Sequence, residues 1–205
     1  MKPWVKPLVI ILGLALLGGL VGAGAAFLAR TEKLGPESVQ SGPNVKEAVP
    51  GPFDPLNING PSAGEKECQF CKNGANPVVM IFARSLADPV PALIKKLDRA
   101  TADHADARMG SCVIFLSGDK DLPGKLKEFA DRENVQRTVL AVYAPAGPHR
   151  YKISEDAEVT ILLYTDETVQ ANYAFGRGRM KDGDIDKVIA DLPKILDKGA
   201  GSHGS

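Results

Sequence analysis

The distribution of apolar and polar residues divides the chain into a long apolar run, a polar stretch and a region of short apolar runs. In the last region, residues 77–84, 111–117 and 138–143 are predominantly apolar and bounded by turn residues, as is typical of strands buried on both faces. Between them, residues 88–104 and 121–130 carry apolar side chains at helical spacing. We therefore predict alternating strands and helices, with right-handed crossovers and a largely parallel arrangement.

The pattern changes on either side of this alternation. Residues 53–60 contain a short alternation that suits an edge strand before a turn. Residues 158–164 and 168–175 are joined by a short polar turn, and the second of them alternates apolar with polar or small residues, which predicts an antiparallel hairpin. A last helix is expected from about Asp184, with Pro193 kinking it or ending its regular part.

The long apolar run covers residues 7–29, carries no charge and is close to the roughly 20 residues that a membrane-spanning helix needs. Basic residues flank it on both sides, so the charge bias that sets orientation is nearly balanced. A lone N-terminal span normally carries its domain across the membrane. We therefore predict a single-pass signal anchor in residues 1–30 at the cell membrane, with the domain on the extracytoplasmic side. The alternative is a cleaved signal peptide, because Ala23-Gly24-Ala25 offers a small-residue cleavage site.

Residues 31–52 contain four prolines and few large apolar side chains, so we predict a flexible linker. Residues 199–205 are rich in glycine and serine and are predicted to be a disordered tail. The remaining residues, 53–198, are enough for one domain of ordinary size.

Composition and motifs exclude several classes of function. The formal net charge is zero and the two signs are interspersed, whereas nucleic-acid binding needs a basic face, so we expect no nucleic-acid partner. No phosphate-binding glycine-rich loop, serine-nucleophile motif or paired-carboxylate constellation is present, and we expect no cofactor. The chain has three cysteines, so one stays unpaired if two form a disulfide, which argues against a disulfide-stapled scaffold.

Cys68 and Cys71 form the one closely spaced cysteine pair in the sequence, in a polar loop before the apolar run that begins at residue 77. Such a pair can exchange disulfides, close a structural disulfide or bind a metal ion. Flanking lysines favour the thiolate form and flanking glutamates oppose it, so the first two interpretations stay open. A zinc site would need more ligands, from Cys112, a histidine or a second chain, and is the weakest interpretation. Cys112 opens a buried strand and is predicted to be an inert apolar residue. Haem attachment is not expected, because residue 72 is a lysine where that motif has a histidine.

The order of these elements resembles the thioredoxin-like fold in its peroxiredoxin and periplasmic TlpA-type form. The opening PFDPLNING resembles the preamble of that family, and PVVMIFAR resembles its first central strand. The stretch from Cys112 to Tyr143 resembles an inserted strand-helix-strand, and VTILLYTDETVQANYAFG resembles the closing hairpin. The resemblance covers most of residues 53–197. It implies an α/β domain with a central mixed sheet flanked by helices. The position of Cys68 and Cys71 beside the central strand suggests thiol-disulfide exchange with a protein partner.

Two positions depart from that family's pattern. Its reactive cysteines lie just after the central strand, at the N-terminus of the next helix, where this chain reads ARSLAD over residues 83–88. Its cis-proline corresponds here to Val159. We therefore expect the usual catalytic centre to be absent. This leaves two hypotheses: exchange through Cys68 and Cys71 as displaced catalytic residues, or a redox-inactive binding module with a structural disulfide.

Overall fold

The continuously apolar runs come together in one sheet of six strands in the computed structural model, which describes residues 39–196. The strand order is β1-β4-β3-β2-β5-β6, so β2 (Val78–Ala83) lies inside the sheet, and all its residues are buried. It pairs in parallel with β3 (Gly110–Leu116) and antiparallel with β5 (Ala157–Thr165). The predicted central place of this strand is confirmed, because a strand that is apolar at every position must be covered on both faces.

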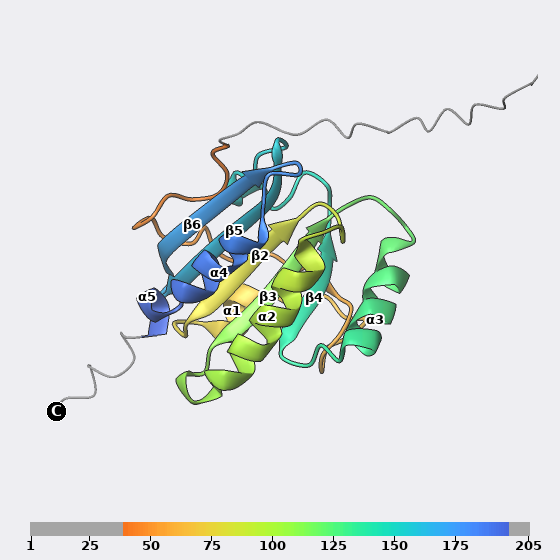
Figure 1. Cartoon of the computed structure of the whole chain (residues 1–205), viewed down its shortest axis with the longest axis horizontal. Helices are drawn as coiled ribbons and strands as arrows, with labels where there is room; N and C mark the ends of the chain where they lie inside the picture. The colour runs from red at the N-terminus through yellow and green to blue at the C-terminus, as the bar shows by residue number, and fades with distance from the viewer. Residues whose placement is uncertain (1–38, 197–205) are drawn as a thin grey trace, which may run out of the picture. The chain divides into compact units, whose positions relative to one another are not determined.

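The outer strands complete a mixed sheet (Figure 1). β1 (Leu56–Asn57) is a short edge strand antiparallel to β4 (Thr138–Tyr143), which is itself parallel to β3. At the other edge, β5 and β6 (Thr168–Gly176) form the predicted antiparallel hairpin. The helices are α1 (Gln69–Asn73), α2 (Val90–Asp103), α3 (Leu122–Glu133), α4 (Asp182–Ala190) and α5 (Pro193–Leu196), with the 3₁₀ helices η1 (Ala105–Ala107) and η2 (His149–Tyr151).

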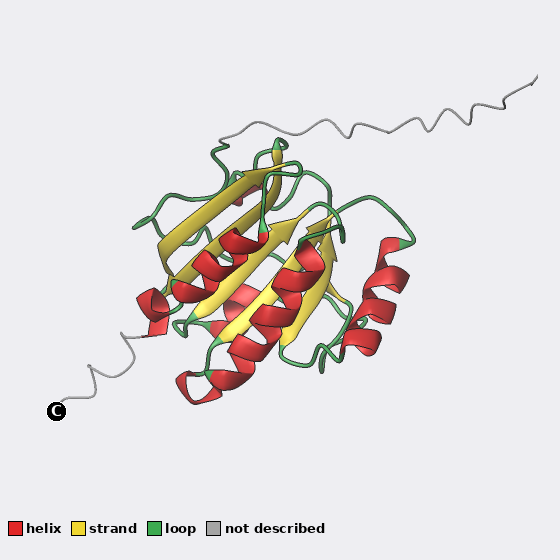
Figure 2. Ribbon diagram, viewed as in Figure 1, coloured by secondary structure: helices red, strands yellow, loops and turns green. Residues whose placement is uncertain are grey.

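Helices and loops cover opposite faces of the sheet. On the first face, the odd-numbered residues of β2 pack against apolar side chains of α2, α3 and α4, and Figures 1 and 2 show α2 and α4 in front of the sheet. On the second face, the even-numbered residues of β2 pack against Val49, Phe53 and Tyr151, which lie outside the long helices. We call this second side the loop-covered face. Phe70 of α1 also packs there, and α1 lies behind the sheet in Figure 1.

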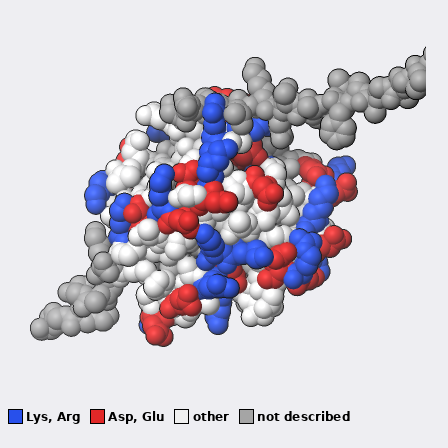
Figure 3. Space-filling view, in the orientation of Figure 1, with Lys and Arg blue, Asp and Glu red and all other residues white. Residues whose placement is uncertain are grey.

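The outer surface of the helices carries charges of both signs, interspersed as the sequence indicates (Figure 3). Lys95 of α2, for example, forms an ion pair with Glu133 of α3 at 2.8 Å. The face seen in Figure 3 therefore has no large area of a single sign.

The flexible linker predicted for residues 31–52 is wrong from residue 39 onward, because residues 39–52 pack on the loop-covered face. Ser41 is buried, and its hydroxyl lies 2.6 Å from the hydroxyl of Thr160 in β5. The backbone N–H of Val49 donates to the carbonyl of Glu167 at 2.8 Å, beside an isolated bridge from this segment to the start of β6. Proline and glycine prevent a regular helix or strand here, but individual residues of the segment still pack against the sheet and form hydrogen bonds with it.

Val49→Ala is expected to lower the free energy of unfolding by about 1–2 kcal/mol, because the removed methyl groups leave a buried site. The Val49 side chain is 6% exposed, whereas that of Val45 in the same segment is 47% exposed. Val45→Ala is therefore a matched control, expected to stay within about 0.5 kcal/mol of wild type. Urea denaturation followed by circular dichroism measures both. Equal effects of the two substitutions would contradict the packing of this segment.

Two of the predicted segments lie near the ends of the chain. The predicted anchor at residues 7–29 and the predicted tail at residues 199–205 lie outside the described residues. Within residues 39–196, no helix combines the length and the apolar character that crossing a bilayer requires.

The last predicted helix is interrupted as expected, since α4 ends at Ala190 and Pro193 begins α5.

Candidate functional site

Cys68 and Cys71 are joined by a disulfide at the start of α1. Cys68 is the N-cap residue in an extended conformation, and its Sγ accepts the backbone N–H of Cys71 at 3.1 Å. Gly74 ends the helix with a φ of 52°, a left-handed value that glycine adopts without steric cost. The predicted polar loop is thus corrected to a short helix capped at both ends.

Side chains of α1 fix this helix to the sheet. Gln69 is 1% exposed, and its Nε2 donates to Oδ1 of Asn57 in β1 at 3.2 Å. On the loop-covered face, the ring of Phe70 lies 6.5 Å from the ring of Tyr164 in β5. Within α1 itself, Asn73 Nδ2 donates to the carbonyl of Gln69 at 2.7 Å, which stabilises the helix but does not attach it to the sheet. The disulfide is therefore held at one place on the domain by contacts other than the disulfide itself.

The two cysteines differ in their exposure to solvent. As whole residues, Cys71 is exposed, whereas Cys68 is partly buried. Lys72 forms an ion pair with Glu67 at 2.9 Å, and this hydrogen bond from Lys72 lowers the pKa of the Glu67 carboxyl. The lysine charge is therefore largely compensated beside the disulfide. The disulfide therefore includes one exposed residue, Cys71, and disulfide exchange depends on such access for an external thiolate.

The disulfide lies at the opposite end of β2 from the family's usual reactive position. Phe70 of α1 contacts Tyr164, and Tyr164 pairs with Val78, the first residue of β2. The usual position follows the last residue, Ala83, where the chain turns towards α2. Because a strand rises about 3.3 Å per residue, β2 separates the two places by roughly 17–20 Å. Cys68 and Cys71 therefore lie far from the family's usual reactive position after Ala83, which we call the reactive corner.

Arg84 fills part of that corner. Its guanidinium donates to three backbone carbonyls: Nε to Ala157 at 2.9 Å, Nη1 to Pro145 at 3.0 Å and Nη2 to Ser154 at 2.9 Å. These bonds tie the end of β2 to the loop that leads into β5. Arg84 therefore holds these chain segments together through hydrogen bonds.

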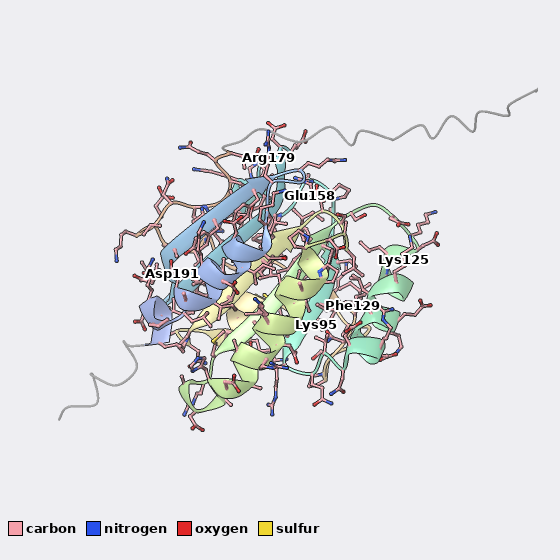
Figure 4. The ribbon with its side chains drawn as sticks, in the orientation of Figure 1. Lys95, Lys125, Phe129, Glu158, Arg179 and Asp191 are labelled. Carbon is pink, nitrogen blue, oxygen red and sulfur yellow. A yellow bond between two sulfur atoms is a disulfide. The ribbon has the colours of Figure 1, made fainter. Side chains whose placement is uncertain are left out.

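Glu158 fills the rest of the corner. The hydroxyl of Ser85 donates to its Oε1 at 2.6 Å, and Arg177 Nε lies 3.7 Å from its Oε2. Arg179 lies at the same end of the molecule as Glu158 in Figure 4. The next residue, Val159, is 2% exposed and pairs with Ala83. The corner is thus occupied by a polar network and contains no cysteine, as predicted. The network itself was not predicted, because its members come from segments far apart in the sequence.

Cys112 lies away from solvent in β3. It is 0% exposed among the apolar side chains of the loop-covered face, and burial raises the pKa of its thiol to about 12. A thiol in this state is a poor nucleophile and a poor metal ligand. Within residues 39–196, no three side chains of His, Cys, Asp or Glu are arranged to hold a metal ion.

Comparison with known proteins gives matches to solved structures. No protein-family model matches the chain, and no curated protein matches it. A candidate protein disulfide isomerase from Bacteroides thetaiotaomicron has 13% identity and a TM-score of 0.60, over 80% of this chain and 99% of that chain. A candidate thioredoxin from Neisseria meningitidis has 11% identity and a TM-score of 0.52, over 79% and 100%. A candidate thiol:disulfide interchange protein DsbE from Chlorobium tepidum has 16% identity and a TM-score of 0.51, over 76% and 99%.

Similarity at this level of identity establishes the fold. Residues 39–196 have a mixed α/β fold of the thioredoxin-like type, as the resemblance of the sequence implied.

Proposed function

From the thioredoxin-like fold and the exposed disulfide of α1, we propose that the chain is a membrane-anchored, extracytoplasmic protein that performs thiol-disulfide exchange. Cys68 and Cys71 are its reactive pair, and its partner is another protein. The observation that carries this proposal is the exposure of Cys71 on a helix fixed to the sheet. Exchange requires a thiolate to reach one sulfur of a disulfide, and the exposure of the Cys71 residue favours such an approach.

The small size of the disulfide ring also supports a reactive role. Only two residues, Gln69 and Phe70, lie between the two cysteines in the sequence. Closing so short a ring stabilises a protein by about 2 kcal/mol in the chain-entropy description, less than a longer loop does. Gln69 and Phe70 hold α1 independently of the sulfur atoms. The domain therefore has little structural need for this bond.

The proposed location depends on the sequence. The uncharged run at residues 7–29 has the length and character of a membrane anchor. A disulfide on the surface of a domain persists in an oxidising compartment and is rare in the cytosol. Both features favour a domain outside the cytoplasm, where disulfide-bearing protein partners are found.

A redox titration of the full-length protein tests the exchange function. In glutathione buffers of graded potential, we expect Cys68 and Cys71 to be half reduced at a potential above about −300 mV, within the range of exchange-active pairs. Alkylation followed by mass spectrometry reads the fraction reduced. Cys112 should stay unmodified in the native protein, because a buried thiol with a pKa of about 12 is almost entirely protonated near neutral pH. A pair that stays oxidised in the most reducing buffer would be a structural disulfide.

The filled corner favours a second candidate function, a redox-inactive binding module. Arg84 directly follows β2 and Glu158 lies beside it in β5, at the end of the sheet where the family has its reactive cysteines, and both are engaged by neighbouring groups. A domain of this kind would use its surface to recognise a partner, with Cys68 and Cys71 permanently joined. The titration above distinguishes the two functions, since this module requires a disulfide that the buffers do not reduce.

A further inference from the structure

The two cysteines of the disulfide differ in exposure and in hydrogen bonding. Cys71 is the more exposed residue of the pair. Cys68 is partly buried at the N-cap of α1, and its sulfur accepts the backbone N–H of Cys71 at 3.1 Å. Cys71 is thus the more exposed cysteine, and the sulfur of Cys68 already has a hydrogen-bond donor.

Given the exchange function proposed above, on which this inference depends, we infer that Cys71 is the sulfur that bonds to the partner and Cys68 is the resolving sulfur. A partner thiolate attacks Sγ of Cys71, and a bond forms between these two sulfurs. The bond between Cys68 and Cys71 breaks, and its electron pair leaves with Cys68 as a thiolate.

A second thiolate of the same partner completes the reaction. It attacks the partner's sulfur in the mixed disulfide, so the partner's own disulfide forms and Cys71 leaves as a thiolate. The partner has lost two electrons and two protons, and Cys68 and Cys71 have gained them as two thiols. The reverse sequence reduces a partner disulfide, with Cys68 displacing the partner from Cys71.

The N-cap position makes Cys68 the better leaving group. A hydrogen bond to a charged acceptor is stronger than one to a neutral acceptor, so the N–H of Cys71 stabilises the Cys68 thiolate as it forms. A better stabilised thiolate leaves faster. Lys72 adds little to this contrast, because Glu67 compensates its charge at 2.9 Å.

Cys68 also stays in place after the disulfide opens. The N–H of Lys72 donates to the carbonyl of Cys68 at 3.0 Å, a bond that does not involve the sulfurs. The Cα atoms of Cys68 and Cys71 are 5.2 Å apart in the disulfide form. With α1 held by Gln69 and Phe70, the Cys68 thiolate remains one helical turn away, where it can resolve a mixed disulfide on Cys71.

Mapping the mixed disulfide on the wild-type protein tests this assignment. The oxidised full-length protein is treated briefly with reduced glutathione, quenched with acid and N-ethylmaleimide, and digested. We expect fragmentation spectra to place glutathione on Cys71 in at least about tenfold excess over Cys68, since each factor of ten corresponds to about 1.4 kcal/mol of preference. Equal labelling, or an excess on Cys68, would overturn the assignment and leave the exchange function standing.

Two single substitutions provide an independent measurement. Cys68→Ser and Cys71→Ser each leave one thiol of the pair, and glutathione disulfide is the probe. The Cys68→Ser variant should form its adduct faster, because Cys71 is the accessible thiol, while Cys71→Ser should show the greater ultraviolet thiolate absorbance at neutral pH. The opposite order in either measurement contradicts the assignment. If neither thiol reacts and the wild-type pair also resists reduction, the exchange function itself fails.

Discussion

Disulfide exchange is expected to fall to background, a loss of at least about 100-fold, when both cysteines of α1 are replaced in the Cys68→Ser/Cys71→Ser variant. The domain should remain folded. The free energy of unfolding should fall by only about 2 kcal/mol, because the lost ring is short and α1 keeps its other contacts. Oxidation of a two-cysteine peptide, followed by alkylation and mass spectrometry, measures the exchange. Thermal unfolding of the same sample measures the stability.

Cys112→Ala is the matched control for this variant. It also removes sulfur, but from a site that is 0% exposed in the sheet. We expect exchange to be unchanged and the free energy of unfolding to fall by about 1 kcal/mol, through the small cavity that remains. Exchange that survives the double substitution, or that disappears with Cys112, would reject the assignment of the reactive pair to Cys68 and Cys71.

Phe53→Ala is expected to lower the free energy of unfolding by about 3–5 kcal/mol, the largest stability effect that we predict. The ring of Phe53 is 7% exposed, and its centroid lies 5.9 Å from that of Phe82, 5.4 Å from Tyr143 and 5.1 Å from Tyr151. The substitution removes the ring that contacts the three other rings of this aromatic cluster on the loop-covered face. At roughly 2–4 °C per kcal/mol for a domain of this size, the midpoint of thermal unfolding should fall by on the order of 10 °C.

Phe53→Leu separates lost volume from lost aromatic contact. Leucine keeps most of the apolar volume, so we expect a destabilisation below about 1.5 kcal/mol. Differential scanning calorimetry of wild type and both variants gives the comparison. A Phe53→Ala protein that unfolds at the wild-type temperature would show that the loop-covered face is not a packed core.

The fold could be predicted largely from local pattern. Residues 77–83 are apolar without a break, and so short a run bounded by turn residues is typical of a strand inside a sheet. The hairpin formed by β5 and β6 was equally clear, because a short polar turn joins two strand-like segments. The site was predicted less completely. The spacing of Cys68 and Cys71 identified the pair, but their place in the sequence does not show how far α1 lies from the corner at the other end of β2.

The sequence by itself therefore determined the order of the elements, the central strand, the cysteine pair and the absence of cysteine after β2, because each of these is a property of neighbouring residues. The tertiary structure alone decided that residues 39–52 pack on the sheet, that Arg84 and Glu158 fill the vacant corner, and that Cys71 is exposed while Cys68 caps α1. The first two of these features depend on contacts between distant segments, which are 119 residues apart for Ser41 and Thr160 and 131 residues apart for Ser41 and Asn172. No local pattern of apolar and polar residues encodes such a contact, since it forms only when the folded sheet brings the two segments together.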